Sequence, residues 1–450
     1  MRLCCLVCYI EKNFKSMTNR TSIYHLPQDD DPTSRTPVII DSGSGYTKMG
    51  LAGTSGPSHV IPTILYRGER DVSSELCQAG IFPLLSSYAS NPLTVIGNAA
   101  VKESIGDVFG STKPIVDGRV KDWSDFEEYM FCCYSQYLKM DPTDRPCVLT
   151  EPPLNPAANR EKLAEIMFET FGVPSMYIGV QAVLALYAYW DGKSAMTGTV
   201  IDSGDGVTHV IPVTDGYVSG TSVREIPIAG KDVTRIISEY LVARKEVHVD
   251  SPESAVALDR LSKQVKENLT YVCRDVLEEF KLYDAKNSAP NLFRKIEWTD
   301  PRTRQNRECD IGYERFMAPE VFFRPELVCE GIKSLPEIVF ESIHASPIDY
   351  RKNLMNNIVL SGGSTMFSNF APRLELELRN SFSSSISSSS SVKINVNGKG
   401  DDLQRFAVWH GASALCNTPG FDKHMFTRGE YDEIGPRVCR DTTITRCLGL

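Results

Sequence analysis

The sequence predicts an α/β protein of two similar lobes, each built from a β-meander and helices, with a phosphate-binding cleft between them. Two nearly matching segments carry this prediction: residues 41–50 read DSGSGYTKMG and residues 202–211 read DSGDGVTHVI. Each follows a short apolar, β-branched run, residues 38–40 and 199–201, which is typical of a buried strand. A strand–turn–strand unit that occurs twice in this way indicates a duplicated plan.

The glycine pairs in these segments explain why they predict phosphate binding. Gly43 and Gly45 in the first copy, and Gly204 and Gly206 in the second, allow a tight turn between two strands. The backbone N–H groups of such a turn can point into one concavity and hold phosphate oxygens. One copy alone is most often an ordinary hairpin turn. Two copies, each with an aspartate at the strand end, favour a clamp that holds a polyphosphate from both sides.

Five polar side chains are candidates for the chemistry of this clamp. Asp41 and Asp202 end the two strands and suit Mg²⁺, which is usually held by few carboxylates together with substrate phosphates. Lys48 would place a positive charge against the phosphates. His209, at the equivalent place in the second copy, is either a residue that polarises water or an ordinary strand histidine. Gln181, in an apolar stretch, is either a satisfied core amide or a cleft residue that orients water near the γ-phosphate.

Composition limits the class of protein. The chain has 450 residues, which predicts more than one lobe with an ample core. Its net charge of −9, with no basic block, argues against non-specific nucleic-acid binding. The thirteen cysteines are scattered, which favours reduced thiols in the cytosol. We expect no membrane span, because no stretch approaches the roughly 20 apolar residues that a span needs.

The first half of the chain alternates strands and helices. Residues 1–36 are polar, and we expect a disordered extension. Residues 37–66 predict a three-strand meander, whereas residues 67–111 have weak periodicity and predict a small mobile subdomain. Helical spacing over 122–138 comes with carboxylates near the N-terminal end, where they suit the helix dipole.

A connection between the lobes is predicted next. Residues 148–153 (VLTEPP) read as a buried strand stopped by two prolines, and residues 159–170 as an amphipathic helix. Residues 176–190 read as a strand end followed by a nearly all-apolar helix. A helix that is apolar all round is buried on every side, so it suits a connector between two lobes.

The second half repeats the plan. Another meander is predicted over 197–220, with helices over 230–245 and 253–284. Residues 358–366 (IVLSGGSTM) predict a strand, a Gly-Gly turn and a helix, whose amides offer another anion or nucleotide-edge site. Residues 381–391 hold nine serines in eleven positions, and we expect a flexible surface loop, either plain or regulated by phosphorylation.

The chain resembles the actin family, in the family's own order, from about residue 37 to 441. Seven segments carry the resemblance: DSGSGYTKMGLAG, LTEPPLNPAANREKLAEIMFETF, QAVLALY, IDSGDGVTHVIPV, IPIAGKD, VKENLTYVC and IVLSGGSTMF. It implies the two-lobed actin/hexokinase/chaperone-ATPase fold of four subdomains, with ATP and a divalent cation in the cleft. We expect subdomain 1 over 37–67, 112–188 and 408–450, subdomain 2 over 68–111, subdomain 3 over 189–228 and 329–407, and subdomain 4 over 229–328.

The resemblance also implies roles for individual residues. Asp41, Gln181 and Asp202 match the residues that hold Mg²⁺ through water, and Gln181 with His209 matches the pair that positions the hydrolytic water. The residues that match the phosphate loops and the ribose edge are Gly43, Ser44, Gly45, Lys48, Gly204, Asp205, Gly206 and Val207. Those that match the adenosine surround are Gly230, Lys266, Glu267, Gly363, Ser364, Met366 and Arg405.

Five segments resemble one branch of the family, an actin-related subunit of the seven-subunit complex that nucleates branched actin filaments. They are TEPPLN, TGTVIDSGDGVTHVIPV, YVCRDVLEEFKLYD, DIGYERFMAPEVFFRPE and YDEIGPRVCR. This implies an ATP-binding assembly protein of the cytoplasm and cytoskeleton, at most a slow ATPase, whose actin-like end templates the daughter filament. The implied partners are a second actin-related subunit, the other subunits of the complex, the filament side, actin monomers and nucleation-promoting factors.

Alternatives and departures stay open at this stage. Conventional actin, another actin-related protein, or a free ATPase or kinase of the same superfold are the rival functions. The segment PIVDGRVKDW carries Asp117 where the family usually has histidine, which puts phosphate-release gating in doubt. Ala412 replaces a usual glycine, which is tolerable if its φ is negative. The family match is weak over 67–111, a region that would face neighbours in a filament.

Overall fold

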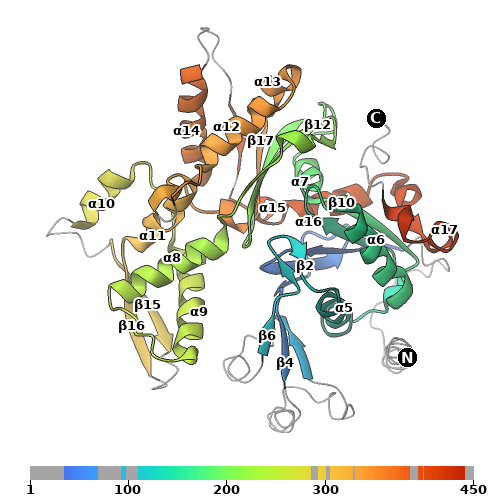
Figure 1. The fold of residues 1–450 in the computed structure, drawn as a ribbon, viewed down its shortest axis with the longest axis horizontal. Helices are drawn as coiled ribbons and strands as arrows, with labels where there is room; N and C mark the ends of the chain where they lie inside the picture. Colours follow the sequence, from blue (N-terminus) through green and yellow to red (C-terminus); the bar gives the residue numbers. More distant parts are fainter. Residues whose placement is uncertain are drawn as a thin grey trace.

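The computed structural model describes residues 35–68, 93–97, 110–284, 292–299, 305–327, 330–385, 394–398 and 400–440. Most of the predicted segments 1–36 and 67–111 lies outside these residues. Figure 1 shows two lobes side by side, with α5, α6 and α17 in one and α8, α9 and α14 in the other. Within the described ranges, none of the helices combines the length and apolar character needed to cross a membrane.

The first lobe is built on a six-stranded sheet in the order β19-β10-β9-β1-β2-β3. Strands β1, β9 and β10 run parallel, and their apolar runs are buried, as expected for strands covered on both faces. The strands are β1 Val38–Ser42, β2 Tyr46–Leu51, β3 His59–Pro62, β9 Cys147–Glu151, β10 Ser175–Val180 and β19 Phe426–Thr427.

The second lobe is built on a sheet in the order β13-β12-β11-β17-β18, with β14 paired to β12. Its parallel strands are β11, β17 and β18. The strands are β11 Gly198–Ser203, β12 Thr208–Thr214, β13 Tyr217–Val218, β14 Arg224–Ile226, β17 Ile358–Ser361 and β18 Val396–Asn397.

The duplication extends to the register of the strands. In the first lobe β1 and β2 are antiparallel, and Asp41 lies opposite Lys48. In the second lobe β11 and β12 are antiparallel, and Asp202 lies opposite His209. Each first strand also has a parallel neighbour, β9 or β17. The predicted pair of meanders is confirmed down to equivalent cross-strand pairs.

Two helices, α7 (Gln181–Ala188) and α16 (Ala407–Cys416), lie between the sheets. They share one apolar core with Ile39 of the first sheet and Val200 of the second. The helices approach so closely that a Cβ built on Gly411 would lie 1.8 Å from the carbonyl oxygen of Leu184. The predicted connector between lobes is therefore confirmed. Ala412, next to that glycine, is fully buried and has no positive φ, so alanine is unstrained there.

The remaining helices lie outside the layer between the sheets. In the first lobe they are α5 Trp123–Cys132, extended by a π-helical segment Cys133–Leu138, α6 Ala157–Glu165, extended by Ile166–Thr170, and α17 Arg428–Ile434. In the second lobe they are α8 Gly230–Ala243, α9 Pro252–Leu269, α10 Val276–Asp284, α11 Glu314–Met317, α12 Leu335–Ala345, α13 Ile348–Asn356, α14 Phe370–Ser385 and α15 Asp402–Arg405. Short strands form three further sheets: β4 Leu65–Gly68 with β5 Leu93–Ile96 and β6 Gly110–Thr112; β7 Ile115–Val116 with β8 Arg119–Val120; and β15 Arg294–Thr299 with β16 Asn306–Ile311.

Two element predictions need correction. The helical span over 253–284 is broken between α9 and α10, because Tyr271 leaves the helix to form a parallel bridge with Ser368. The loop predicted over 381–391 is wrong for its first five residues, which are the last turns of α14. Phe382 supplies the reason: its ring is 1% exposed and packs on the ring of Phe340, which holds the helix in place.

Candidate functional site

A cavity of about 420 Å³ lies between the two meanders, within the range of pockets that bind small ligands. It is lined by both glycine turns, the C-terminal part of α9, the turn after β17, and α15. Every predicted site residue except Gly230 lines it: Asp41, Gly43, Ser44, Gly45, Lys48, Gln181, Asp202, Gly204, Asp205, Gly206, Val207, His209, Lys266, Glu267, Gly363, Ser364, Met366 and Arg405.

Polar groups converge on the buried carboxylate of Asp41, which is 2% exposed. Lys48 Nζ lies 2.9 Å from Asp41 Oδ2, and Thr150 Oγ1 donates to Oδ1 at 2.6 Å. The side chain of Gln181, at the first residue of α7, points the same way, with Nε2 at 3.5 Å from Asp41 Oδ1. Gln181 was predicted to be either a core amide or a cleft residue, and the structure favours the cleft residue, because its side chain lines the cavity.

The second turn is held by buried hydroxyls. Thr208 Oγ1 and Ser203 Oγ are 2.7 Å apart, and Thr208 also donates to the carbonyl oxygen of Ile228 at 2.6 Å. His209 is 8% exposed, and its Nε2 lies 3.5 Å from Glu225 Oε2 on the neighbouring strand β14. Its imidazole is therefore fixed beside the cavity by a carboxylate.

The two turns meet across the cleft, and their close approach requires glycine. A Cβ built on Gly45 would lie 2.4 Å from Cβ of Asp205, and one built on Gly206 would lie 3.0 Å from Ser44 Oγ. A Cβ built on Gly204 or Gly363, by contrast, would meet no protein atom within 4 Å. These two glycines leave open space in the cavity wall, which suits a ligand that approaches the backbone closely.

Lys266 and Gly230 contact the second turn. Lys266 Nζ donates to the carbonyl oxygen of Gly230 at 3.0 Å and lies 3.6 Å from Asp205 Oδ1. Burial lowers the pKa of Lys266, although the nearby carboxylates of Asp205 and Glu267 oppose the shift. Gly230 does not line the cavity; its N–H donates to the carbonyl oxygen of Gly204 at 3.0 Å. Gly230 therefore supports the second turn from behind.

Several residues of the site were not predicted. Thr150, next to the last residue of β9, reaches the site through its hydrogen bond to Asp41, and the strand-ending prolines of VLTEPP could have indicated it, because parallel strands end at one edge. Tyr46 had no such signal, since its partner comes from the other lobe: its hydroxyl lies 3.5 Å from Glu267 Oε1. Burial, with the charge of Glu267, raises the pKa of Tyr46 to about 12. The others include Val60, Gly118, Asn268, Thr270, Ser361, Gly362, Phe367, Phe406 and Val408.

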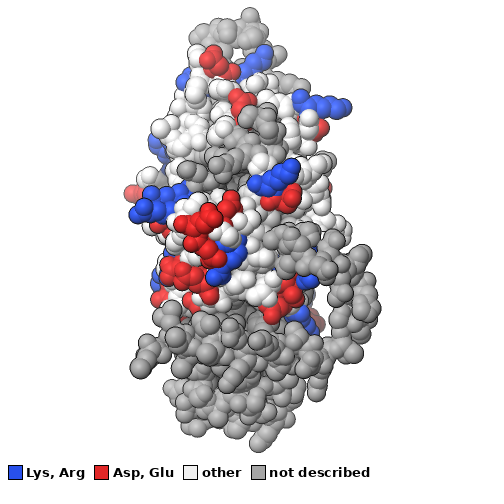
Figure 2. Space-filling view, turned by 90° about the vertical axis from the view of Figure 1, so that its right-hand side faces the viewer, with Lys and Arg blue, Asp and Glu red and all other residues white. Residues whose placement is uncertain are grey.

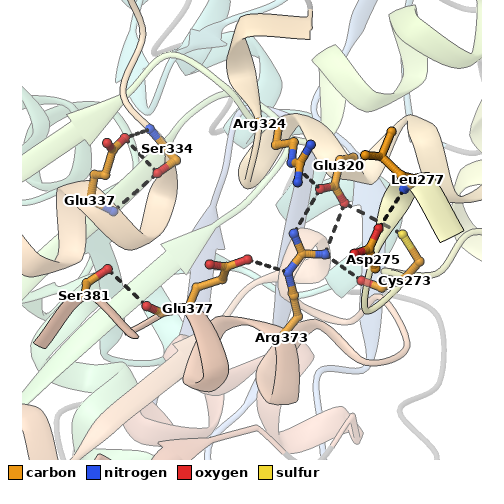
Figure 3. Close-up of polar contacts among 10 residues, drawn as sticks. All are labelled: Cys273, Asp275, Leu277, Glu320, Arg324, Ser334, Glu337, Arg373, Glu377 and Ser381. Atoms are coloured by element: carbon orange, nitrogen blue, oxygen red, sulfur yellow. Dashed lines mark hydrogen bonds and ion pairs between the residues drawn. The ribbon is translucent and has the colours of Figure 1, made fainter. Parts of the chain in front are cut away.

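A buried ion-pair network fixes the segment that follows α9 (Figure 3). Arg373 of α14 pairs with Glu320 at 3.0 Å, and both side chains are almost fully buried. The same guanidinium donates to the carbonyl oxygen of Cys273 at 2.7 Å and pairs with Glu377 at 2.9 Å. Because Thr270 lines the cavity three residues before Cys273, this network anchors one wall of the site to α14.

Comparison with known proteins places this geometry in a family. The family model described as Actin matches residues 33–443. "Actin-related protein 3" of Dictyostelium discoideum is 42% identical over 432 residues, which are 92% of this chain and 99% of that relative. Its namesake in Acanthamoeba castellanii is 41% identical over 90% of this chain and 97% of the relative. The namesake in Saccharomyces cerevisiae is 38% identical over the same shares.

Proposed function

Because the chain belongs to the actin family, we propose that its cleft binds ATP with Mg²⁺. The residues present fit such a ligand. Two glycine turns face the cavity from opposite lobes, and Gly204 and Gly363 leave open space at its wall. Asp41, Gln181 and Asp202 would hold Mg²⁺ through water, and the cation would neutralise charge on the phosphates.

The remaining cavity residues divide into two groups in this proposal. The two turns and Lys48 hold the phosphates, and the surround from Lys266 to Arg405 holds the adenosine. Gln181 and His209 orient a water toward the γ-phosphate. Neither is a strong general base, so hydrolysis is slow and the protein acts mainly as an ATP-binding assembly protein.

The test of nucleotide binding is a thermal melt of the purified chain with Mg²⁺ and ATP, ADP or neither. We expect both nucleotides to raise the melting temperature, the tighter-binding one by more, and EDTA to remove part of the gain. Direct titration with a fluorescent ATP analogue gives the Kd. A chain that shows no shift and no titration signal would contradict the proposal.

We further propose that the protein is one of the two actin-related subunits of the seven-subunit complex that nucleates branched actin filaments. The single observation that carries this proposal is the likeness to the Dictyostelium "Actin-related protein 3", which extends over 99% of that relative. The proposed partners are actin-related protein 2, the other five subunits, the side of an existing filament, actin monomers and nucleation-promoting factors. Such a role places the protein in the cytoplasm, on the cytoskeleton.

One end of the first lobe supports a templating role. The helices after residue 157 and the C-terminal block pack together: the rings of Phe168 and Tyr431 stack with centroids 4.6 Å apart, and Tyr431 donates to Glu169 at 2.7 Å. Arg160 Nη1 donates to the carbonyl oxygen of Arg440 at 2.9 Å. We propose that this joint surface docks the first actin of the daughter filament.

The test of this role is affinity isolation of the tagged full chain from its own cells, with mass identification of what co-purifies. We expect a second actin-related protein and five further subunits in equal amounts. Recovery of the chain alone, or in filaments made of itself, would point instead to a conventional actin.

A further inference from the structure

The turn between β7 and β8 sits behind both phosphate loops. Asp117 and Gly118 are the two central residues of this hairpin, since Val116 pairs with Arg119. Their φ angles are +49° and +75°, the left-handed pair that a tight hairpin requires. Asp-Gly is a favoured sequence for such a turn, because aspartate and glycine tolerate positive φ. The turn is therefore rigidly defined by its own sequence.

This turn contacts both glycine loops. Gly118 N–H donates to Ser44 Oγ of the first loop at 2.7 Å. A Cβ built on Gly206 of the second loop would lie 3.3 Å from Cα of Asp117. The turn belongs to the first lobe but touches the second, so its position sets how closely the loops approach.

An ion pair completes the link between the lobes. Lys231 Nζ lies 2.6 Å from Asp117 Oδ1, and Lys231 is the second residue of α8 in the second lobe. The backbone N–H of Lys231 also donates to the carbonyl oxygen of Asp205 in the second loop at 2.9 Å. Opening of the cleft would therefore separate two opposite charges, each carried by a segment that is hydrogen-bonded to one of the two loops.

We propose that Asp117 and Lys231 are positioning residues that form a charge latch behind the cleft, hold the phosphate loops together and slow the release of bound nucleotide. The inference rests on the proposed nucleotide binding. The latch acts through the loops and does not touch the nucleotide, because neither side chain lines the cavity. The ligand class is a nucleoside polyphosphate, which needs both loops at once.

The size of the effect follows from solvent exposure. The side chains of Lys231 and Asp117 are 42% and 47% exposed, so water and salt screen their attraction. We expect loss of the pair to speed nucleotide release by roughly two- to fivefold, the range that exposed ion pairs produce. Release from the parent should also accelerate with added salt.

The experiment is a double-mutant cycle on the full chain, read by the release rate of a fluorescent ATP analogue after a chase with unlabelled ATP. Asp117→Asn keeps the left-handed turn, since asparagine also tolerates positive φ, and removes only the charge. Lys231→Met keeps the aliphatic stem. Each single change should speed release, and the double variant should be no faster than either one. Neither variant should show the salt dependence of the parent.

The control is the ion pair between Glu278 and Lys281, which lies within the single helix α10. Its N–O distance is 2.7 Å, and both side chains are 70% exposed. Glu278→Gln with Lys281→Met should leave release unchanged. Hydrogen exchange at the amides of residues 43–45 and 204–207, without nucleotide, gives a second readout: it should quicken in the Asp117→Asn protein.

The outcomes separate the two proposals. A parent chain that binds no nucleotide contradicts the proposed function, and the exchange readout still decides the latch. A parent that binds nucleotide, with variants that match it in release rate, salt dependence and exchange, overturns the latch.

Discussion

Lys48 and Asp41 form the most consequential pair at the scale of single residues. They lie opposite each other on β1 and β2, and Lys48 is the charged partner of a carboxylate that is 2% exposed. A buried carboxylate needs such a partner, because burial of an uncompensated charge is costly. The same ammonium group reaches the cavity, where phosphate oxygens would share it.

Replacement of Lys48 by alanine tests this shared role. With ATP about 1,000-fold above Kd, binding should stabilise the parent by about 4 kcal/mol, and Lys48→Ala should lose most of this gain. The measurement is the shift in melting temperature on adding Mg-ATP, taken for each protein against its own ligand-free form. This comparison removes any loss caused by the unpaired Asp41. Lys281→Ala, on α10, is the control, and an equal shift in Lys48→Ala and the parent would contradict the role.

Gln181 and His209 should act on the hydrolysis barrier more than on binding. Both face the cavity, and His209 is fixed by Glu225, which suits side chains that orient water. Gln181→Ala and His209→Ala should therefore slow single-turnover hydrolysis more than they raise the Kd for ATP. A variant with unchanged hydrolysis and greatly weakened affinity would show that its residue holds the nucleotide instead.

At the scale of elements, α14 shows that composition alone misplaces a helix end. The serine-rich tract was predicted to be a loop over 381–391, yet α14 runs to Ser385. Phe382 belongs to the tract, and its buried ring contacts both Phe340 and His344. One buried aromatic side chain therefore outweighs the low helix propensity of its serine neighbours.

Phe382→Ala should destabilise the protein by about 3–5 kcal/mol, because it leaves a cavity against α12. Chemical denaturation measures the change in the free energy of unfolding. Leu376→Ala, on the same helix but 39% exposed, is the matched control and should cost much less. An equal loss of unfolding free energy in the two variants would mean that the ring of Phe382 is not buried against α12.

A histidine on α16 should make the stability of the folded protein depend on pH. Burial lowers the pKa of His410 below its usual 6.5, against the opposing charges of Asp402 and Asp401. As the pH falls below 6.5, the unfolded chain therefore gains a proton that the folded protein resists, and stability is lost. Burial, with Lys139, moves the pKa of His59 in the same direction.

Removal of His410 should weaken this dependence. When the pH falls from about 7.5 to 5.5, through the unfolded pKa, we expect the melting temperature of His410→Gln to fall less than that of the parent. His424→Gln serves as the control for loss of an imidazole elsewhere. If melting temperature changed with pH equally in the parent and in His410→Gln, His410 would not be the source of the pH dependence.

Local patterns predicted part of the site, the resemblance to the actin family added residues such as Lys266 and Arg405, and contacts between distant segments account for what both missed. The strands, glycine turns and aspartates follow from alternating apolar runs and turn residues, which are properties of neighbours in sequence. Tyr46 was missed because its partner Glu267 belongs to the other lobe, and no spacing rule connects them. The break after α9 was missed because Tyr271 pairs with Ser368, almost a hundred residues later. The bounds of the four subdomains stay a prediction.

At the scale of the whole molecule, several contacts among the described residues join the two lobes. The helices α7 and α16 share one apolar core with both sheets, the glycine turns meet at the cleft, and Asp117 pairs with Lys231 behind it. A ligand that bridges the turns would favour closure of the cleft, because it binds both turns at once. The face drawn in Figure 2 carries basic side chains scattered among acidic ones. We propose that such closure prepares the end formed by α6 and α17 to receive actin.

The most direct test of this account is the number of filament branches formed on existing actin filaments by the complex reconstituted with and without this chain, in Mg-ATP and with an activator. We predict that branches form only when the chain is present, and that the chain alone stays in the supernatant on sedimentation. Undiminished branching from the complex that lacks the chain would contradict the account.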